Sequence, residues 1–324
     1  MKNILITGGA GYIGSHVVAA LGERGYAVLT YDNLSKGHRD AVLQGELIVG
    51  DLADTALLEK TIKDFRPDAV MHFAAFIEVG ESVREPLKYY HNNAANAINL
   101  FSSMEKFGVR KLIFSSTAAV YGNPEKSLIT EESPIRPINP YGQAKTFVEK
   151  VLQDASTAKG LRYVALRYFN AAGADPRGRI GERHDPESHL IPLILETALG
   201  KRKSIEIYGT DYQTPDGTCI RDFIHVMDLA DAHLRALQYL FEDGESDVFN
   251  CGYGHGYSVR EVIETARAVT GVAIPTVHTG RRPGDPAVLV ADSTKLKKKL
   301  NWIPRHDDLE YIIRTAWEWE RKQA

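Results

Sequence analysis

The sequence predicts an α/β fold in which a doubly wound parallel sheet is joined to a smaller mixed α/β lobe. Strand-like apolar runs alternate with helical patterns through the first half of the chain. The first of these runs, Ile4–Thr7, leads directly into a glycine-rich turn and then a helical pattern. After Asn170 the alternation becomes less regular. Alternating strands and helices are typical of parallel βαβ units, so we expect a Rossmann-type sheet followed by a separate lobe.

The first half contains the strands and helices of this sheet. The expected strands are Ile4–Thr7, Val28–Tyr31, Leu47–Val49, Val70–Phe73, Leu112–Ser115 and Tyr163–Tyr168. Helical patterns lie between them at Ser15–Glu23, Leu57–Asp64, Pro86–Phe107 and Tyr141–Lys159. Because crossover connections are right-handed, this series predicts one sheet with helices on both faces.

The second half begins with a boundary loop, Ala171–Pro186, that is rich in Gly, Ala, Pro, Asp and Arg. Later elements are expected at 191–199, 205–208, 228–240, 247–251, 259–270 and 309–321. We expect residues 1–171 to form a nucleotide-binding domain and 172–324 a substrate lobe, with parts of about 222–252 returning to the first domain. The basic run Lys295–Lys299 is interpreted as a solvated helical face.

Composition limits the classes of function. The 324 residues are 44% hydrophobic and 25% charged, which is typical of a globular protein. A formal charge of −3 gives no basic field for nucleic acid. Two cysteines, Cys219 and Cys251, cannot form a disulfide framework, and no run approaches the ~20 apolar residues of a membrane span. We therefore expect a soluble, cytoplasmic protein with neither a nucleic-acid nor a membrane partner.

The strongest local signal is the turn Thr7-Gly-Gly-Ala-Gly-Tyr-Ile-Gly14, with glycines at Gly8, Gly11 and Gly14. It follows a strand and opens a helix, where glycines let a pyrophosphate approach the helix N-terminus. This context favours dinucleotide binding over a plain tight turn. Asp32 ends the next strand, and a carboxylate there accepts hydrogen bonds from ribose hydroxyls and repels a 2′-phosphate, favouring NAD over NADP.

Two alternatives stay open at this end of the site. Asp32 is also compatible with a turn cap, and Lys36 and Arg39 follow closely enough to leave a preference for NADP open. Asp51, at the end of the third strand, suits either the adenine edge or an ordinary loop position.

A second constellation is Tyr141-Gly-Gln-Ala-Lys145, whose i, i+4 spacing puts phenol and ammonium on one helical face. A free tyrosine has a pKa of about 10, and a nearby lysine cation, together with the positive nicotinamide of oxidised cofactor, lowers that pKa by stabilising phenolate. The pair could then take a proton from a substrate hydroxyl as hydride leaves the same carbon. Thr117 follows the strand Leu112–Ser115, at the edge where open α/β sheets bind ligands, and could hydrogen-bond the reacting oxygen.

Taken together, these motifs resemble the extended short-chain dehydrogenase/reductase family, and within it the nucleotide-sugar 4-epimerases. The likeness extends over essentially the whole chain. It also includes the segments His72–Ala75, Val79–Val83, Leu166–Gly173, Gly217–His233 and Arg281–Pro286.

The resemblance implies an NAD-dependent enzyme that interconverts UDP-galactose and UDP-glucose at C4 through a 4-keto sugar. It implies catalytic roles for Thr117, Tyr141 and Lys145. The NAD site would be lined by Gly8, Gly11, Tyr12, Ile13, Gly14, Asp32, Asn33, Asp51, Leu52, Phe73, Ala74, Asn92, Tyr141, Lys145 and Tyr168. The UDP-sugar would contact Thr117, Tyr141, Asn170, His189, Leu190, Tyr208, Arg221, Arg282, Asp285 and Leu289. Homodimers are common in the family, and we expect one here.

Three departures from the family pattern bear on function. Thr117 stands where many relatives have serine, and Phe76–Val79 lacks a lysine that some relatives place near the cofactor. Leu289 replaces a bulky tyrosine of some relatives beside the sugar's 2-substituent, which suggests that UDP-GlcNAc and UDP-GalNAc are accepted as well.

Other functions on the same fold are alternatives to this one. Related 4,6-dehydratases need an acid–base pair after the active-site threonine, where this chain has Ala118 and Ala119. A decarboxylase or a catalytically silent nucleotide-binding protein on the same fold are further alternatives. The run His184-Asp-Pro-Glu-Ser-His189 superficially resembles metal ligands, but it lies in the boundary loop without a supporting cluster. We therefore expect no metal, and His189 to face the substrate or cap the next helix.

Overall fold

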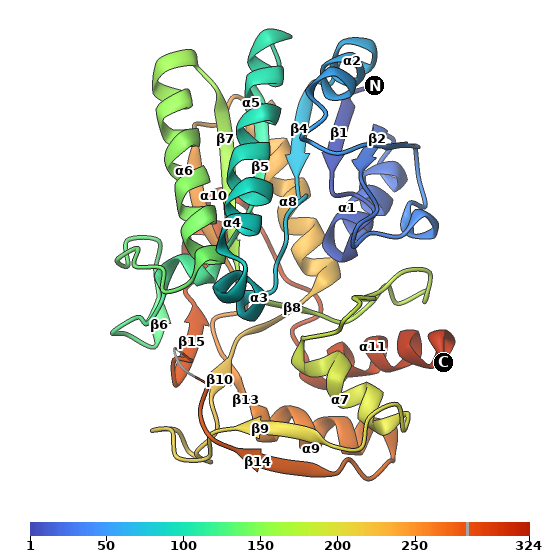
Figure 1. Ribbon diagram of the computed structural model, residues 1–324, viewed down its shortest axis with the longest axis vertical. Helices are drawn as coiled ribbons and strands as arrows, with labels where there is room; N and C mark the ends of the chain where they lie inside the picture. The colour runs from blue at the N-terminus through green and yellow to red at the C-terminus, as the bar shows by residue number, and fades with distance from the viewer. Residues whose placement is uncertain (283–284) are drawn as a thin grey trace.

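A seven-stranded sheet forms the larger part of the computed structural model, which describes residues 1–282 and 285–324 (Figure 1). Every neighbouring pair of strands is parallel, and the register places the carboxyl ends of the strands at one edge. The order across the sheet is β12 (Asp247–Cys251), β7 (Arg162–Tyr168), β5 (Lys111–Thr117), β4 (Ala69–His72), β1 (Asn3–Thr7), β2 (Ala27–Asp32) and β3 (Glu46–Val49). The expected doubly wound sheet is confirmed, and β12 comes to it from the second half of the chain.

Helices cover both faces of this sheet. Because successive strand residues point to opposite faces, Ile4 and Ile6 pack on one side and Leu5 on the other. The Ile4 side carries α1 (Tyr12–Glu23) and α8 (Val226–Phe241). The Leu5 side carries α2 (Thr55–Phe65), α5 (Asn96–Lys106) and α6 (Pro140–Lys159). Two short helices, α3 (Val79–Arg84) and α4 (Pro86–Tyr89), lie against α6.

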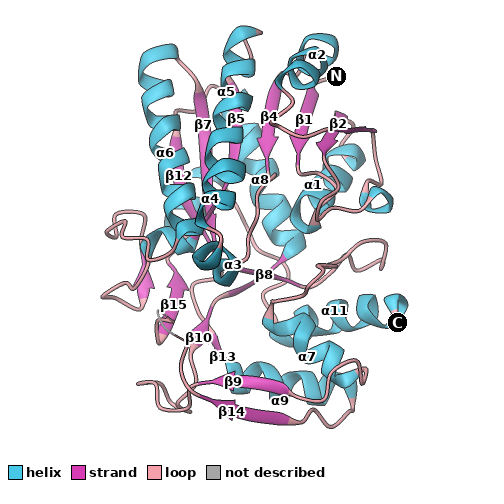
Figure 2. Ribbon diagram, viewed as in Figure 1, coloured by secondary structure: helices cyan, strands magenta, loops and turns pink. Residues whose placement is uncertain are grey.

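The smaller lobe combines short sheets with helices and lies beyond the carboxyl edge of the large sheet (Figure 2). Its four-stranded sheet has the order β13 (Tyr257–Ser258), β10 (Ile220–Arg221), β15 (Val288–Ala291) and β6 (Leu128–Ile129). Two further parallel pairs join β8 (Asn170–Ala172) to β11 (Phe223–His225) and β9 (Ile205–Tyr208) to β14 (Thr276–Thr279). The helices are α7 (Leu190–Ala198), α9 (Val259–Thr270), α10 (Thr294–Leu300) and α11 (Leu309–Gln323).

One hydrophobic core runs from the large sheet into this lobe. Ile191 of α7, Val262 of α9 and Ile312 of α11 belong to the same buried cluster as Ile4 of β1. The lobe therefore packs directly on the α1–α8 layer, and its position relative to the sheet is fixed by apolar burial. A functional division near residue 171 stays a prediction.

The helical pattern expected over Pro86–Phe107 is confirmed, but the helix is not regular throughout. Here α4 is followed by a wider π-helical turn, Tyr90–Ala95, before α5 begins. The turn directs Asn93 to the loop after β4, where its side-chain amide donates to the Phe76 carbonyl and accepts from the Phe76 N–H, both at 2.8 Å. Such π-helical turns are frequent at functional sites.

The interpretation of Lys295–Lys299 as a solvated helical face is also incomplete. The run lies in α10, where Lys295 and Lys299 both pair with Asp247 of β12, at 2.5 and 2.6 Å. These lysines tie the helix to the edge strand. Among the described residues, no helix is long and apolar enough to cross a membrane, and both cysteines are buried, free thiols.

Candidate functional site

A cavity of about 1360 Å³ opens at the carboxyl edge of the large sheet and is lined from both lobes. Small-molecule pockets are typically about 300–1,000 Å³, so this one can hold a dinucleotide together with a second ligand. All the residues that the sequence assigns to a site line it: Gly8, Gly11, Tyr12, Ile13, Gly14, Asp32, Asn33, Asp51, Leu52, Phe73, Ala74, Asn92, Thr117, Tyr141, Lys145, Tyr168, Asn170, His189, Leu190, Tyr208, Arg221, Arg282, Asp285 and Leu289. Which ligand each one contacts stays a prediction.

The glycine turn is built for close backbone approach. Gly8 has a φ of +75°, and a Cβ added there would lie 2.4 Å from the Ala74 nitrogen. A Cβ on Gly14 would lie 2.2 Å from the Gly8 carbonyl oxygen. Gly11 is the N-cap of α1. Because glycine has no side chain that could accept from the N–H groups of the first helical turn, these groups are left to bind an anion. These features fit the diphosphate of NAD.

Asp32 lies at the end of β2 and is buried beside this turn. Its carboxylate accepts hydrogen bonds from the N–H groups of Ala10 at 2.9 Å and Leu34 at 2.8 Å, which orients both oxygens. Each oxygen keeps a further lone pair for a ribose hydroxyl. The glycine turn and this carboxylate therefore fit an adenosine ribose without a 2′-phosphate.

Lys36, one of the two cations that left a preference for NADP open, is already paired with other groups of the protein. Lys36 lies 3.1 Å from a Glu78 carboxylate oxygen and donates to the Asp185 carbonyl at 2.7 Å. Arg39 is not among the described residues that line the cavity. Lys36 also brings an ammonium to the segment Phe76–Val79, which lacks a lysine of its own.

The second constellation lies across the cavity from the glycine turn. Asn139 caps α6 by accepting from the Gly142 N–H at 2.8 Å, and this places Tyr141 in the first helical turn. Lys145 Nζ donates to the Ser115 carbonyl of β5 at 2.8 Å. Thr117 is the last residue of β5, and its hydroxyl accepts from the Ala119 N–H at 3.1 Å. The helix and the strand end thus present phenol, ammonium and hydroxyl to one space.

Burial controls the ionisation of this group. It raises the pKa of Tyr141, and the Thr117 hydroxyl beside the phenol acts in the opposite direction. Burial lowers the pKa of Lys145 to about 7, against the attraction of Glu149. The predicted lowering of the Tyr141 pKa by Lys145 together with the positive nicotinamide of oxidised NAD stays a prediction. A phenolate at neutral pH needs positive charge beyond what these side chains supply.

The far end of the cavity carries the other predicted charges. Asp285 lies between two arginines, 3.3 Å from Arg221 Nη2 and 3.0 Å from Arg282 Nε. Arg221 is held further by the Pro286 carbonyl at 2.9 Å, and Arg282 lies over the Tyr208 ring at 4.7 Å. The intervening Pro283 and Gly284 of the Arg281–Pro286 motif lie outside the described residues.

The cavity also has lining residues that the sequence did not identify: Phe169, Glu182, Cys219 and Phe223. Phe223 reaches it because β11 pairs with β8, an arrangement without a local sequence signal. Glu182 joins His184, Glu187 and His189 in a compact cluster, so His189 does not cap α7 with its side chain. The sequence singled out only the histidines and the residues between them.

Comparison with known proteins agrees with this geometry. Residues 4–252 match the model of the NAD dependent epimerase/dehydratase family. A protein of Azospirillum brasilense named UDP-glucose 4-epimerase is 52% identical over 319 residues, covering 98% of this chain and 92% of its own.

Two solved structures are similar over nearly the whole chain. The UDP-glucose 4-epimerase of Brucella ovis, solved in complex with NAD, superposes with a TM-score of 0.96 at 48% identity, covering 98% of each chain. The UDP-Glc/GlcNAc 4-epimerase of Campylobacter jejuni superposes with a TM-score of 0.88 at 46% identity, covering 99% of this chain and all of its own.

The pKa of Lys145 predicts a pH dependence of stability. With a pKa of about 7 in the fold and 10.5 ordinarily, the unfolded chain binds more protons between those values, so folding stability should rise with pH across that window. For this one group, the free energy of unfolding should rise by up to about 1.4 kcal/mol per pH unit. Urea unfolding of wild type and Lys145→Met from pH 7 to 9.5 would measure it. A wild-type minus variant difference that stays constant with pH would contradict the assignment.

Proposed function

The chain belongs to the NAD-dependent epimerase/dehydratase family, and we propose that it interconverts UDP-galactose and UDP-glucose by epimerisation at C4. The protein is an isomerase, and NAD is its cofactor. The observation that carries the mechanism is that Tyr141, Lys145 and Thr117 line the same cavity as the glycine turn.

The glycine turn, the N-terminus of α1 and Asp32 would hold NAD. When bound, NAD accepts the C4 hydride of the sugar and gives it back. Cofactor is regenerated in each turnover, so tight retention does not slow the reaction. Residues 1–171, with returning parts of about 222–252, would then serve the nucleotide and 172–324 the UDP-sugar.

Proton transfer falls to Tyr141. Its phenolate removes the proton of the 4-hydroxyl, with the Thr117 hydroxyl hydrogen-bonded to the reacting oxygen. Burial opposes the phenolate, so the positive charge that oxidised NAD supplies when bound would favour it, and Lys145 would hold the cofactor's ribose. The neutral phenol would later return the proton to the reacting oxygen, which completes the inversion at C4.

Turning of the 4-keto sugar requires an anchor at the other end. Arg221 and Arg282 offer planar guanidinium groups for the diphosphate, and Asp285 between them can accept from ribose hydroxyls. Holding UDP there leaves the sugar ring to rotate in the wide part of the cavity. A UDP-sugar is therefore the expected partner of this surface.

A dehydratase reaction is less well supported. Elimination needs an acid and a base beside the oxidised carbon, and the residues that follow Thr117 into the cavity are Ala118 and Ala119. A catalytically silent nucleotide-binding protein would have no need of the complete group of Tyr141, Lys145 and Thr117.

The reaction is tested by incubating the purified protein with UDP-galactose, without added cofactor, and separating the UDP-sugars by chromatography. We expect a mixture with UDP-glucose in excess. Tyr141→Phe should lower the rate by about 100-fold or more, because a general acid–base group is lost, while NAD released on denaturation stays at the wild-type level.

Tyr26→Phe is the matched control, since Tyr26 lies outside the residues that line the cavity. Substantial turnover by Tyr141→Phe would show that the base is misassigned. A 4-keto-6-deoxy product would indicate a dehydratase, and no conversion of UDP-galactose even with added NAD would overturn the proposed substrate.

We further propose that N-acetylated UDP-hexosamines are substrates. Leu289 lines the cavity and is the parallel cross-strand partner of Arg221, so it lies beside the anchored end of the UDP-sugar. Leucine leaves more space for an N-acetyl group than the tyrosine of some relatives. The similarity to a UDP-Glc/GlcNAc 4-epimerase supports this assignment.

Leu289→Tyr should lower kcat/KM for UDP-GalNAc relative to UDP-galactose by roughly tenfold or more, because the larger ring excludes the acetyl group. Leu289→Met, which conserves volume, should leave the ratio near that of wild type. Coupled assays on both substrates measure the two ratios. Equal losses on both substrates in Leu289→Tyr would refute the specificity role.

We propose a homodimer in the cytoplasm. Exposed apolar side chains gather on α3 to α6 and the π-helical turn, elements that lie together on one side of the molecule (Figure 1). They are Val83, Leu87, Tyr90, Ile98 and Phe147, with Leu87 exposed by 74%. A monomer would leave this contiguous surface in water, and a second copy would bury it. The two free thiols suit a reducing compartment.

Leu87→Glu should convert the dimer to a monomer of 36.0 kDa, because it places a charge in the apolar interface. Ile303→Glu is the control, since Ile303 is exposed by 70% but lies outside this surface. Light scattering after size exclusion reports both masses. A monomeric wild type, or an unchanged Leu87→Glu dimer, would contradict the proposed interface.

A further inference from the structure

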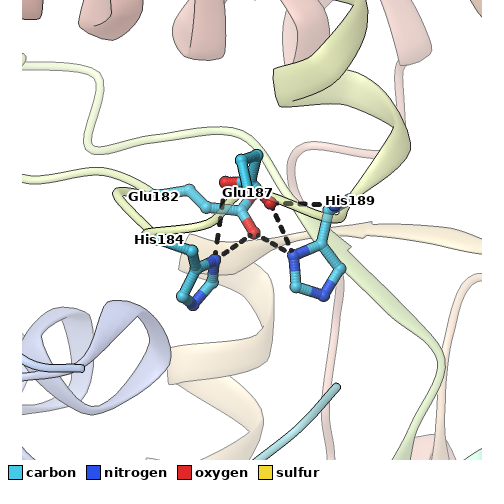
Figure 3. A group of neighbouring side chains, drawn as sticks. All are labelled: Glu182, His184, Glu187 and His189. Carbon is cyan, nitrogen blue, oxygen red and sulfur yellow. Dashed lines mark hydrogen bonds and ion pairs between the residues drawn. The ribbon is translucent and has the colours of Figure 1, made fainter. Parts of the chain in front are cut away.

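A cluster of two carboxylates and two imidazoles lies in the loop between β8 and α7, and of its members only His189 is predicted to contact the UDP-sugar. Glu182, His184, Glu187 and His189 converge there, and their ligand atoms all lie within 4.8 Å of one another (Figure 3). Both histidines present Nδ1 to the carboxylates, and their second ring nitrogens point away. Four donor atoms thus surround a common point.

The distances between donors suit a tetrahedral ion. Glu182 Oε1 lies 3.2 Å from His184 Nδ1 and 2.8 Å from His189 Nδ1. Glu187 oxygens lie 3.5 Å from His184 Nδ1 and 3.1 Å from His189 Nδ1. With metal–ligand bonds of about 2.0–2.1 Å, the edge of a tetrahedron is about 3.3–3.4 Å. The four carboxylate–imidazole distances lie near this value, but Glu187 would have to turn one oxygen toward both imidazoles, and the donors, which now span up to 4.8 Å, would have to close around the ion.

The hydrogen bonding is incomplete for a set of ordinary ion pairs. His184 Nδ1 is buried and has no hydrogen-bond partner among the described residues, although carboxylate oxygens lie at 3.2 and 3.5 Å. In an ordinary ion pair, the Nδ1–H bond of His184 would point at one of these oxygens. A neutral His184 with its Nδ1 lone pair directed between the two carboxylates would have the arrangement of a metal ligand. Without an ion, the carboxylates outweigh burial and raise the pKa of His184 to about 9 and that of His189 to about 10, which favours imidazolium–carboxylate pairs.

Charge points the same way. The side chains of Glu182 and Glu187 are each only 6% exposed, and two adjacent buried carboxylates require compensating positive charge. Two protonated imidazoles would make the group neutral, and so would a divalent ion with two neutral imidazoles. Two imidazoles and two carboxylates form an N₂O₂ set that suits zinc, whereas magnesium and calcium prefer oxygen ligands at higher coordination number.

We propose that Glu182, His184, Glu187 and His189 form a structural binding site for one zinc ion. All four ligands come from the protein, which closes the coordination sphere as in structural rather than catalytic zinc sites. The site goes beyond the proposed epimerase activity, since no step of that reaction passes through it.

The ion would fix the loop that spans the two lobes over the cavity. On one side of the loop, the Arg183 carbonyl lies 2.9 Å from His38 Nε2, and the Asp185 carbonyl accepts from Lys36. On the other side, His189 directly precedes α7, whose first residue Leu190 lines the cavity. Zinc would therefore join the nucleotide side to the start of the lobe helix.

The test uses the full chain with its NAD, treated with a chelator, passed through metal-free buffer and titrated with zinc by calorimetry. We expect one zinc per chain and a higher thermal midpoint in its presence. Cobalt in place of zinc should give the visible absorption of a tetrahedral complex. His184→Gln and Glu187→Gln should each weaken zinc binding by at least about tenfold, since even changes behind the ligands cost this much.

His255→Gln is the matched control, because His255 pairs with Asp307 at 2.8 Å on the surface, away from the cluster. Its zinc stoichiometry and affinity should equal those of wild type. NAD content confirms that each variant folds. Less than one saturable zinc per chain in wild type, an octahedral cobalt spectrum, or equal binding by His184→Gln and wild type would each overturn the proposal.

Discussion

A buried ion pair between Glu149 of α6 and Arg167 of β7 holds the catalytic helix against the sheet. Arg167 Nε and Nη2 donate to the two carboxylate oxygens at 2.9 and 2.5 Å, and Ser116 of β5 donates to the same carboxylate at 2.5 Å. Glu149 lies one turn beyond Lys145 and two beyond Tyr141, so fixing it fixes the rotation of α6. The catalytic face is thereby held over the end of β5. Removing one partner would strand a buried charge, so the pair constrains both elements together.

The same carboxylate shapes the electrostatics of the site. Lys145 is buried, which disfavours its cation, and Glu149 is the charge that opposes this loss. The lysine therefore stays close to the boundary between neutral and charged forms, and its ammonium is satisfied by the Ser115 carbonyl rather than by the phenol. Tyr141 in turn depends on charge brought by the nicotinamide. In the proposed reaction, deprotonation of the substrate would thus be coupled to the oxidised state of the cofactor, and a reactive base would not form without its hydride acceptor.

The sequence predicted the sheet and the cavity because both follow from local patterns. A strand, a glycine turn and a helix define the nucleotide end, and the carboxyl ends of parallel strands must share one edge, so Asp32 and Thr117 were both predicted to lie at that edge. The lobe was less predictable. Its strands are two to four residues long and pair across large sequence separations, as β8 does with β11 and β10 with β15. The π-helical turn at Tyr90–Ala95 and the entry of Glu182 into the histidine cluster depend on tertiary contacts that leave no periodic signal.

The distribution of polar groups along the cavity suits a reaction in which hydride must be able to return to either face of the same sugar. Strong directional groups are concentrated at its two ends, where Asp32 meets the glycine turn and where Asp285 joins two arginines. Between them, Ala118 and Ala119 follow Thr117, and Leu289 borders the predicted UDP-sugar end. None of these three apolar side chains can hold one orientation of a 4-keto sugar by hydrogen bonds. An anchor that fixes UDP and a middle that binds the ring weakly give two hydride-return geometries of similar energy, which is what interconversion of two C4 epimers requires.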